Sequence, residues 1–202
     1  MTAGTPWLNI YSVNGEMTMD YEIRELWLGE PGRRIYGKLY LPLGVERPRL
    51  LIYAHEIACT HARARVFAER LAPLGLAVFA PDFRGGGDHC KSDGRTEDMT
   101  VLGEVEDLET VFDAALGWDF ADGSRPALIG ASQGGFVSAI YAGRHPERVS
   151  VLTLLYPAYG IPDEMRRYSA SVTHIPEKCK YDDMFWIGRR YITEMLDYDP
   201  YG

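Results

Sequence analysis

The chain has 202 residues, of which 46% are hydrophobic and 25% charged, a composition that indicates one globular domain and excludes disordered and fibrous classes. The formal net charge is −8 without any Lys/Arg cluster, so nucleic acid is not an expected partner. No apolar run approaches the ~18 residues of a membrane helix, and residues 1–20 carry no signal-peptide pattern. We therefore expect a cytoplasmic protein with no membrane partner.

The cysteines are three, Cys59, Cys90 and Cys179. Their number is odd, and they have neither C-x-x-C spacing nor a nearby histidine pair, which argues against a disulfide framework and against a zinc site. We expect neither a metal nor a cofactor.

The first predicted elements are two strands, residues 21–28 and 34–41, in which apolar and polar residues alternate on either side of the turn sequence Gly-Glu-Pro-Gly. Nearly continuous apolar runs, typical of strands buried on both faces of a parallel sheet, follow at 50–54, 76–80, 127–129 and 149–155. Helical patterns separate them at 63–71, 101–116 and 136–143. This order predicts an α/β fold, with a mostly parallel sheet and an N-terminal antiparallel hairpin.

The helix predicted at 101–116 is amphipathic, with apolar residues at i, i+3 and i+4 spacing, so it should lie against the sheet. Its acidic residues are expected on the opposite face: Glu104, Glu106, Asp107 and Glu109. Residues 156–182 have few apolar repeats and are predicted to be irregular, whereas 183–196 are predicted to be helical. Together, residues 157–196 are expected to form a small cap over a site within a single domain spanning 1–202.

A buried strand, the pattern G-x-S-x-G and a helix follow one another around Ser132. On so tight a strand-to-helix turn the serine crowds the residues two before and two after it, which requires small residues at Gly130 and Gly134. The turn raises the serine hydroxyl above the sheet edge and directs backbone N–H groups to where an oxyanion forms. Ser132 is therefore the predicted nucleophile.

From Tyr21 to its end the chain resembles the α/β-hydrolase superfamily, and in particular its small bacterial serine esterases of the feruloyl (cinnamoyl) type. The strand-to-helix turn at Ser132, called the elbow below, carries the resemblance together with five further blocks in the right order. These blocks are His55-Glu56-Ile57, Asp82-Phe83-Arg84-Gly85-Gly86-Gly87, Lys91-Ser92-Asp93-Gly94, Asp98-Met99-Thr100-Val101 and His174-Ile175-Pro176-Glu177. The resemblance implies a small-molecule ester as substrate and an oxyanion hole made by the backbone N–H groups of Ile57 and Gln133.

Glu56 departs from this family, which usually has His-Gly at that loop. His-Glu-Ile instead resembles the dienelactone hydrolases, which use a cysteine where this chain has Ser132. Glu56 is a possible auxiliary base, but since most charged loop residues are solvated or paired, we favour an ion pair with Arg63 or Arg84.

The catalytic acid and histidine of this fold, which follow the serine in the order Ser, Asp or Glu, His, are not found in the chain. His145 is expected at the end of the helix after the elbow, and His174 belongs to the cap. The resemblance implies two more strand–helix units, about 60 residues, so the chain reads as C-terminally truncated. Without those units the strand at 149–156 should expose an apolar edge through which copies assemble, or which makes the chain poorly soluble.

The leading hypothesis is a serine carboxylic-ester hydrolase acting through an acyl-enzyme, which the resemblance suggests is specific for hydroxycinnamoyl or other small aromatic acyl esters. Aromatic side chains of the cap form the acyl pocket or merely pack the cap: Tyr156, Tyr159, Tyr168, Tyr181, Phe185 and Trp186. A catalytically impaired, truncated remnant or binding module is one alternative. A dienelactone-hydrolase-like enzyme is the other.

Overall fold

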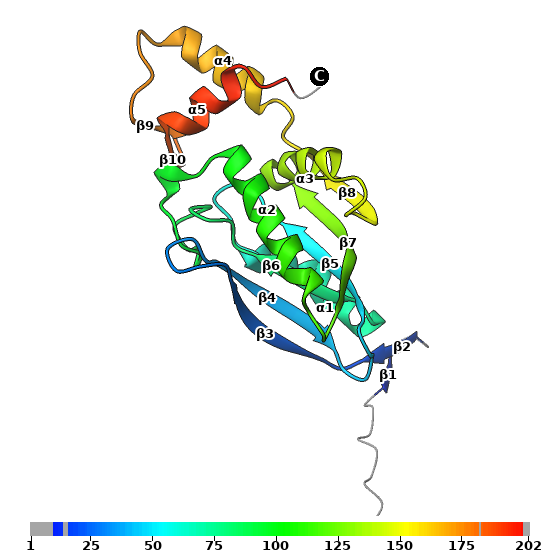
Figure 1. Ribbon diagram of the computed structural model, residues 1–202. Coiled ribbons are helices and arrows are strands. Elements are labelled where there is room, and N and C mark those ends of the chain that lie inside the picture. Colours follow the sequence, from blue (N-terminus) through cyan, green and yellow to red (C-terminus); the bar gives the residue numbers. More distant parts are fainter. Residues whose placement is uncertain (1–9, 14–15, 182, 200–202) are drawn as a thin grey trace, which may run out of the picture.

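A six-stranded sheet forms the centre of the computed structural model, which describes residues 10–13, 16–181 and 183–199 (Figure 1). Its strand order is β3-β4-β6-β5-β7-β8. The strands are β3 (Tyr21–Leu28), β4 (Ile35–Pro42), β5 (Arg49–Ala54), β6 (Ala77–Pro81), β7 (Asp122–Ala131) and β8 (Val151–Leu155). β4 pairs antiparallel with β3 and β6, and the remaining pairs are parallel. The predicted hairpin and mostly parallel sheet are confirmed.

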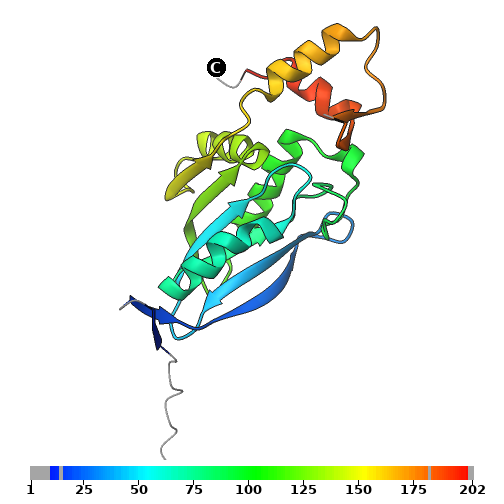
Figure 2. The same ribbon diagram turned by 180° about the vertical axis from the view of Figure 1, so that it is seen from behind.

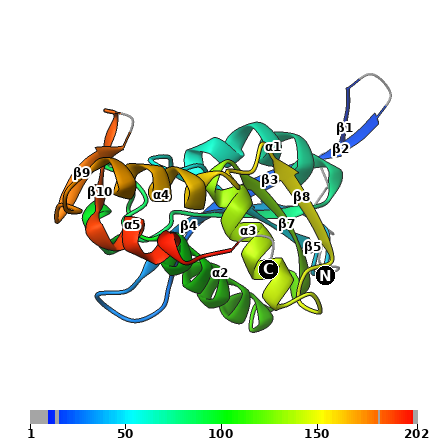
Figure 3. The same ribbon diagram turned by 90° about the horizontal axis from the view of Figure 1, so that it is seen from above.

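Helices cover both faces of this sheet. α1 (Arg65–Leu71) lies on one face, and α2 (Val101–Leu116) and α3 (Gln133–Arg144) lie on the other (Figures 2 and 3). Short 3₁₀ turns occur at η1 (His61–Ala64), η2 (Ala72–Leu74) and η3 (Thr96–Asp98), and a separate hairpin of β1 (Ile10–Val13) and β2 (Glu16–Met19) precedes the sheet. Because both faces are covered, every residue of β6 is buried.

The segment after the sheet contains more structure than predicted. It holds α4 (Ile161–Ser171), β9 (Lys178–Tyr181), β10 (Phe185–Gly188) and α5 (Arg189–Leu196), above the carboxyl ends of the strands (Figure 1). The expectation of an irregular 156–182 is wrong, because Pro162 and two acidic residues open a helix in its first turn. The expectation of a helix over 183–196 is wrong in its first half, which pairs with β9 as a hairpin.

α5 docks firmly on the main body. Tyr191, Ile192 and Met195 are fully buried in the main hydrophobic core. At the start of the helix, a Cβ on Gly188 would lie 1.9 Å from the carbonyl oxygen of Glu97, so only glycine allows this approach. These contacts join the cap segment, residues 157–196, to the body beside the start of α2.

The acidic residues of α2 do not share one solvent face, contrary to the expectation. Glu106 is exposed, but Glu104 and Asp107 are buried, at 1% and 0% exposure. The reason is that α2 packs against the sheet, against α3 and against α5, so that only a narrow strip of its surface meets solvent.

β8 also differs from the other apolar runs. It pairs with β7 and, among the described residues, with no other strand. Val151 is 59% exposed and Leu152 37% exposed. Burial on both faces, expected from the sequence run, is therefore wrong for this strand, whereas the expected open edge is observed.

Candidate active site

Ser132 occupies a strained position between the end of β7 and the start of α3. Its backbone has φ 51° and ψ −120°, a left-handed region that non-glycine residues adopt only when their surroundings hold them there. The surroundings do so here: the Ser132 N–H donates to the carbonyl of Leu155 (3.0 Å), and its own carbonyl accepts from the N–H groups of Gly135 (3.0 Å) and Ala158 (2.9 Å). The elbow is thus braced by the chain that leaves β8.

The glycines around Ser132 have no room for a side chain. A Cβ on Gly130 would lie 2.3 Å from the Ser138 Oγ, and one on Gly134 would lie 2.3 Å from the carbonyl oxygen of His55. The second contact also shows that the first turn of α3 lies directly against the end of β5. It therefore places the elbow beside the loop that carries Ile57.

The loop after β5 makes a tight turn. The Cys59 N–H donates to the Glu56 carbonyl (3.2 Å), and Ala58 at the third position has φ 57°, where a glycine or asparagine is the usual choice. A Cβ on Gly87 would lie 3.0 Å from the Ala58 carbonyl carbon, so the glycine-rich loop after β6 presses on this turn. Within the described part of the chain, neither the Ile57 N–H nor the Gln133 N–H has a hydrogen-bond acceptor, as an oxyanion hole requires.

The His55 side chain holds this turn in place through two hydrogen bonds. It is fully buried; its Nδ1 donates to the Glu56 carbonyl (2.7 Å), and its Nε2 accepts from the Phe83 N–H (3.1 Å). Burial lowers the pKa of His55, and because a backbone N–H points at Nε2, the neutral ring carries its proton on Nδ1. His55 therefore serves to connect the turn to the loop after β6.

Glu56 forms an ion pair with Arg63. Its Oε1 accepts from the Arg63 Nη2 (2.9 Å) and from the Tyr156 hydroxyl (3.1 Å). Burial acts to raise the pKa of Glu56, but the hydrogen bonds from Arg63 and Tyr156 outweigh burial and lower it. Of the two arginines considered, Arg84 pairs instead with the buried Asp107 of α2. Glu56 is thus an ionised, paired group that links the turn after β5, residues 56–59, to the segment after β8.

Neither of the two histidines that follow the elbow has a hydrogen bond to Ser132 among the described residues. His145 ends α3, a helix of 12 residues and therefore about 18 Å long, and its Nε2 lies 3.4 Å from the Glu109 carboxylate of α2. His174 is exposed in the cap segment. His145 is therefore not placed to take a proton from the serine.

A histidine–aspartate pair that the sequence did not bring to notice lies at the same edge of the sheet. The His61 Nδ1 is 2.8 Å from the Asp82 Oδ1, and Asp82 is fully buried. Asp82 also accepts from the backbone N–H groups of His61 (2.6 Å) and Lys91 (2.9 Å), which lower its pKa against the effect of burial. The pair lies at the end of β6, and β5 separates it from β7, which leads to the elbow. It joins η1 to the loop after β6.

The sequence did not indicate two buried polar side chains near the elbow, those of Gln133 and Glu104. Gln133, predicted only as a backbone donor, has a buried side chain whose Oε1 accepts from the Tyr191 hydroxyl (2.7 Å) of α5. Glu104 of α2 lies buried beside it. The sequence signal was the i, i+3 spacing of Glu104 and Asp107 within an apolar helix face.

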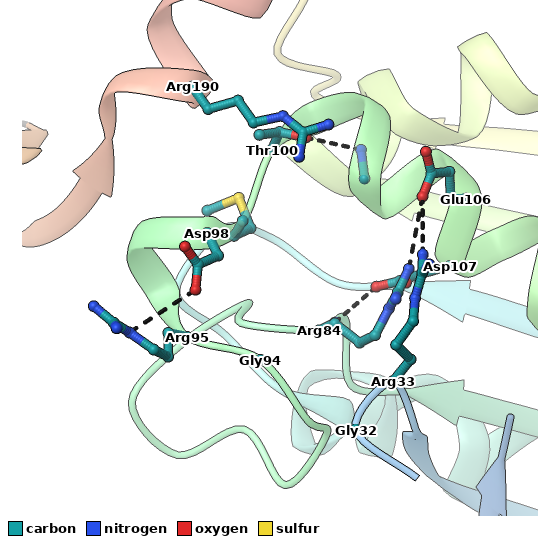
Figure 4. Close-up of a pocket in the computed structure, with 12 residues that line it drawn as sticks. Gly32, Arg33, Arg84, Gly94, Arg95, Asp98, Thr100, Glu106, Asp107 and Arg190 are labelled. Atoms are coloured by element: carbon teal, nitrogen blue, oxygen red, sulfur yellow. Dashed lines mark hydrogen bonds and ion pairs between the residues drawn. The ribbon is translucent and has the colours of Figure 1, made fainter. Parts of the chain in front are cut away.

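A cavity of about 170 Å³ opens beside the start of α2. Figure 4 shows four arginines around it, with Arg33 and Arg84 both directed at Glu106 and Arg190 entering from α5. Neither Ser132 nor Ile57 lines this cavity. Its carboxylates already form ion pairs with its arginines. The cavity is therefore separate from the site around Ser132.

Most aromatic side chains of the cap segment serve its packing. Tyr159 packs edge-on against Phe136 of α3, and Tyr181 packs against Phe185 and Tyr191. Tyr156, just before the segment, and Trp186 are different, because they are 66% and 46% exposed. Only these two of the aromatics expected at an acyl pocket present large exposed surfaces.

Among the residues that the structure describes, no group of three or more metal-ligating side chains comes together. In that same part of the chain, no helix has the length and apolar character needed to span a membrane.

Comparison with known proteins connects this site to a family. The family described as Hydrolase_4, serine aminopeptidase S33, matches residues 46–184. The mouse acylamino-acid-releasing enzyme is 27% identical over 146 residues, covering 67% of this chain and 19% of that enzyme. A monoacylglycerol lipase of Mycolicibacterium smegmatis is 30% identical over 140 residues, covering 67% of this chain and 46% of the lipase. The chain thus spans less than half the length of these curated relatives.

Among solved structures, Est1E from Butyrivibrio proteoclasticus with bound ferulic acid has a TM-score of 0.75 and 24% identity, covering 87% of this chain and 72% of Est1E. This likeness shows a shared fold.

Proposed function

Because the chain belongs to the Hydrolase_4 family of serine aminopeptidase S33 type, we propose that Ser132 is the nucleophile of a carboxylic-ester hydrolase. The Ser132 Oγ attacks the ester carbonyl and gives its proton to solvent water, since the described residues place no base beside it. Water later returns a proton to the leaving alcohol, and the N–H groups of Ile57 and Gln133 hold the oxyanion. Collapse expels the alcohol and leaves an acyl-enzyme, which water then hydrolyses to the acid. The observation that carries the proposal is the strained backbone of Ser132, next to Gln133 and beside the loop of Ile57, whose N–H groups have no acceptors among the described residues.

We propose small aromatic acyl esters, such as hydroxycinnamates, as the substrate class. The fold match to Est1E with ferulic acid supports this, as does the exposed ring of Tyr156, whose hydroxyl donates to the Glu56 carboxylate of the turn after β5. Aromatic rings on both partners would stack over the acyl group.

Labelling with a fluorophosphonate probe tests the nucleophile. We expect a covalent adduct at Ser132 that is lost in Ser132→Ala and unchanged in Ser150→Ala, a control on an exposed serine. Because the described residues place no base beside Ser132, the rate should lie several powers of ten below that of an intact triad. An adduct on any other residue would contradict the assignment.

A non-catalytic binding module is the second candidate, favoured by the position of His145 at the far end of α3 from the elbow. It predicts that a hydroxycinnamate ester binds the folded chain, while neither labelling nor turnover exceeds the level of Ser132→Ala. Equilibrium binding measured beside the labelling assay separates the two functions.

The ion pair of Glu56 gives the test of a dienelactone-hydrolase-like role. If Glu56 only pairs with Arg63 and Tyr156, Glu56→Gln should lower the free energy of unfolding by roughly 1–3 kcal/mol and change the labelling rate at Ser132 less than tenfold. The matched control is Glu69→Gln, which removes an exposed ion pair with Arg65 and should have little effect. A fall of a hundredfold or more in labelling, with the fold intact, would instead assign a chemical role to Glu56.

We also propose that the open edge of β8 pairs with a second copy of this chain. The unpaired backbone groups of an edge strand and the exposed Val151 and Leu152 support strand addition. Sedimentation of the wild type should show a dimer or larger species that Leu152→Lys shifts to monomer. A wild type that sediments as a monomer at all concentrations would remove the proposal.

A further inference from the structure

Three elements bring buried polar side chains together beneath the elbow: Glu104 from α2, Gln133 from α3 and Tyr191 from α5. Each is no more than 1% exposed. The Tyr191 hydroxyl donates to the Gln133 Oε1 (2.7 Å), while the Gln133 Nε2 lies 3.5 Å from the Met99 Sδ. Neither carboxyl oxygen of Glu104 has a hydrogen-bond partner within the described residues.

The cluster of Glu104, Gln133 and Tyr191 leaves one side-chain N–H donor and one carboxyl without a partner. A glutamine side chain has one carbonyl oxygen, here taken by Tyr191, and two N–H donors, of which one faces only the weakly accepting sulfur of Met99. Glu104 lies beside this amide, and Gln133 favours its charged form. The second N–H of Gln133 and the carboxyl of Glu104 are therefore each other's remaining partners.

We propose that Glu104 is a positioning residue for Gln133, acting as a neutral carboxylic acid that, together with Tyr191, holds the Gln133 side chain and so the direction of its backbone N–H. The inference rests on the proposed oxyanion role of that N–H. It also makes α5, an element of the cap segment, part of the support of the reacting centre.

The charges around Glu104 agree with a neutral acid. Burial raises the pKa of Glu104 to about 8, Gln133 opposes this, and Asp107 on the same helix adds to it. α3 presents Gln133, and α5 presents Tyr191 with Glu194 on the next turn, whose carboxylate accepts from the Leu102 N–H. Among the described residues no cation acts on Glu104. A proton therefore neutralises the Glu104 carboxyl. Loss of this proton in alkaline solution places an unpaired negative charge beside Gln133.

Gln133 is the only glutamine among the 202 residues, which allows a single-site measurement. Glutamine labelled with ¹³C at the backbone carbonyl and at Cδ gives one pair of signals from the whole chain. These signals should titrate together between about pH 6 and pH 10, with a midpoint near that of the Glu104 carboxyl. Glu104→Gln, which keeps the shape, adds a second pair of signals from residue 104, and the pair that it shares with the wild type, that of Gln133, should no longer titrate.

Two controls complete the test. Glu106→Gln, on the exposed side of the same helix, also adds a second pair of signals, and it should leave the titration of the Gln133 pair unchanged. Tyr191→Phe should displace the Cδ signal at every pH while the titration persists. The proposal is overturned if the Gln133 signals do not titrate or titrate equally in Glu104→Gln. This readout needs no reaction at Ser132, so failed labelling with a normal titration would reject the proposed function and not this inference.

Discussion

Replacing Glu104 with glutamine should stabilise the protein by up to about 4 kcal/mol at pH 8. The carboxyl is 1% exposed and burial raises its pKa to about 8, from an ordinary value of 4.5. Between these two values the folded state holds a proton that the unfolded state has released, so the wild type loses stability as the pH rises through that window. Glutamine cannot ionise and avoids this loss.

Urea unfolding of the wild type and Glu104→Gln at a series of pH values measures this effect. The difference in free energy of unfolding should be less than about 1 kcal/mol at pH 5 and should grow toward pH 8. Glu106→Gln, which removes an exposed carboxylate from the same helix, should show no such growth. A difference that stays constant across the range would mean that Glu104 is not the protonated group.

Alanine in place of Gly134 is expected to destabilise the fold by about 3 kcal/mol or more. The new methyl group would lie 2.3 Å from the carbonyl oxygen of His55 and 2.4 Å from that of Ala54. Both atoms belong to the backbone at the end of the central strand β5, so neither can turn aside as a flexible side chain does. Relief of the clash requires α3 to move away from the sheet.

Gly143→Ala is the matched control, since both glycines belong to α3 and a Cβ on Gly143 has nothing within 4 Å. It should leave stability unchanged or raise it by about 0.5–1 kcal/mol through helix propensity. Thermal or urea unfolding of the two variants makes the comparison. Equal stability of both would show that the elbow has more space than the contacts indicate.

The sheet could be read from the sequence because its strands are local signals. Alternation in β3 and β4 and the apolar runs of β5 and β6 each lie within a few residues, and the short segments between them leave few possible topologies. The elbow was also a local signal, because Gly130, Ser132 and Gly134 all lie within five residues of the sequence.

The burial of the α2 carboxylates and the structure of the cap segment could not be predicted, because they depend on contacts between segments far apart in the chain. An amphipathic pattern assigns every carboxylate of α2 to solvent, yet Glu104 is covered by α5, which begins 85 residues later at Arg189. α4 escaped notice because only Ile161, Pro162 and Met165 of its 11 residues are buried. The hydrogen bond from Tyr191 to Gln133 likewise exists only once the cap segment has folded back onto α3.

The docking of α5 has a consequence for cleavage of the backbone. Half of the six residues between α4 and β9 are exposed and none is buried, and such connections are where proteases cut folded proteins. The polypeptide beyond such a cut would remain attached through the buried faces of Tyr191, Ile192 and Met195 and through the Glu194 carboxylate on the Leu102 N–H (3.0 Å). A nicked molecule would therefore migrate as two fragments under denaturing conditions and as one particle under native ones.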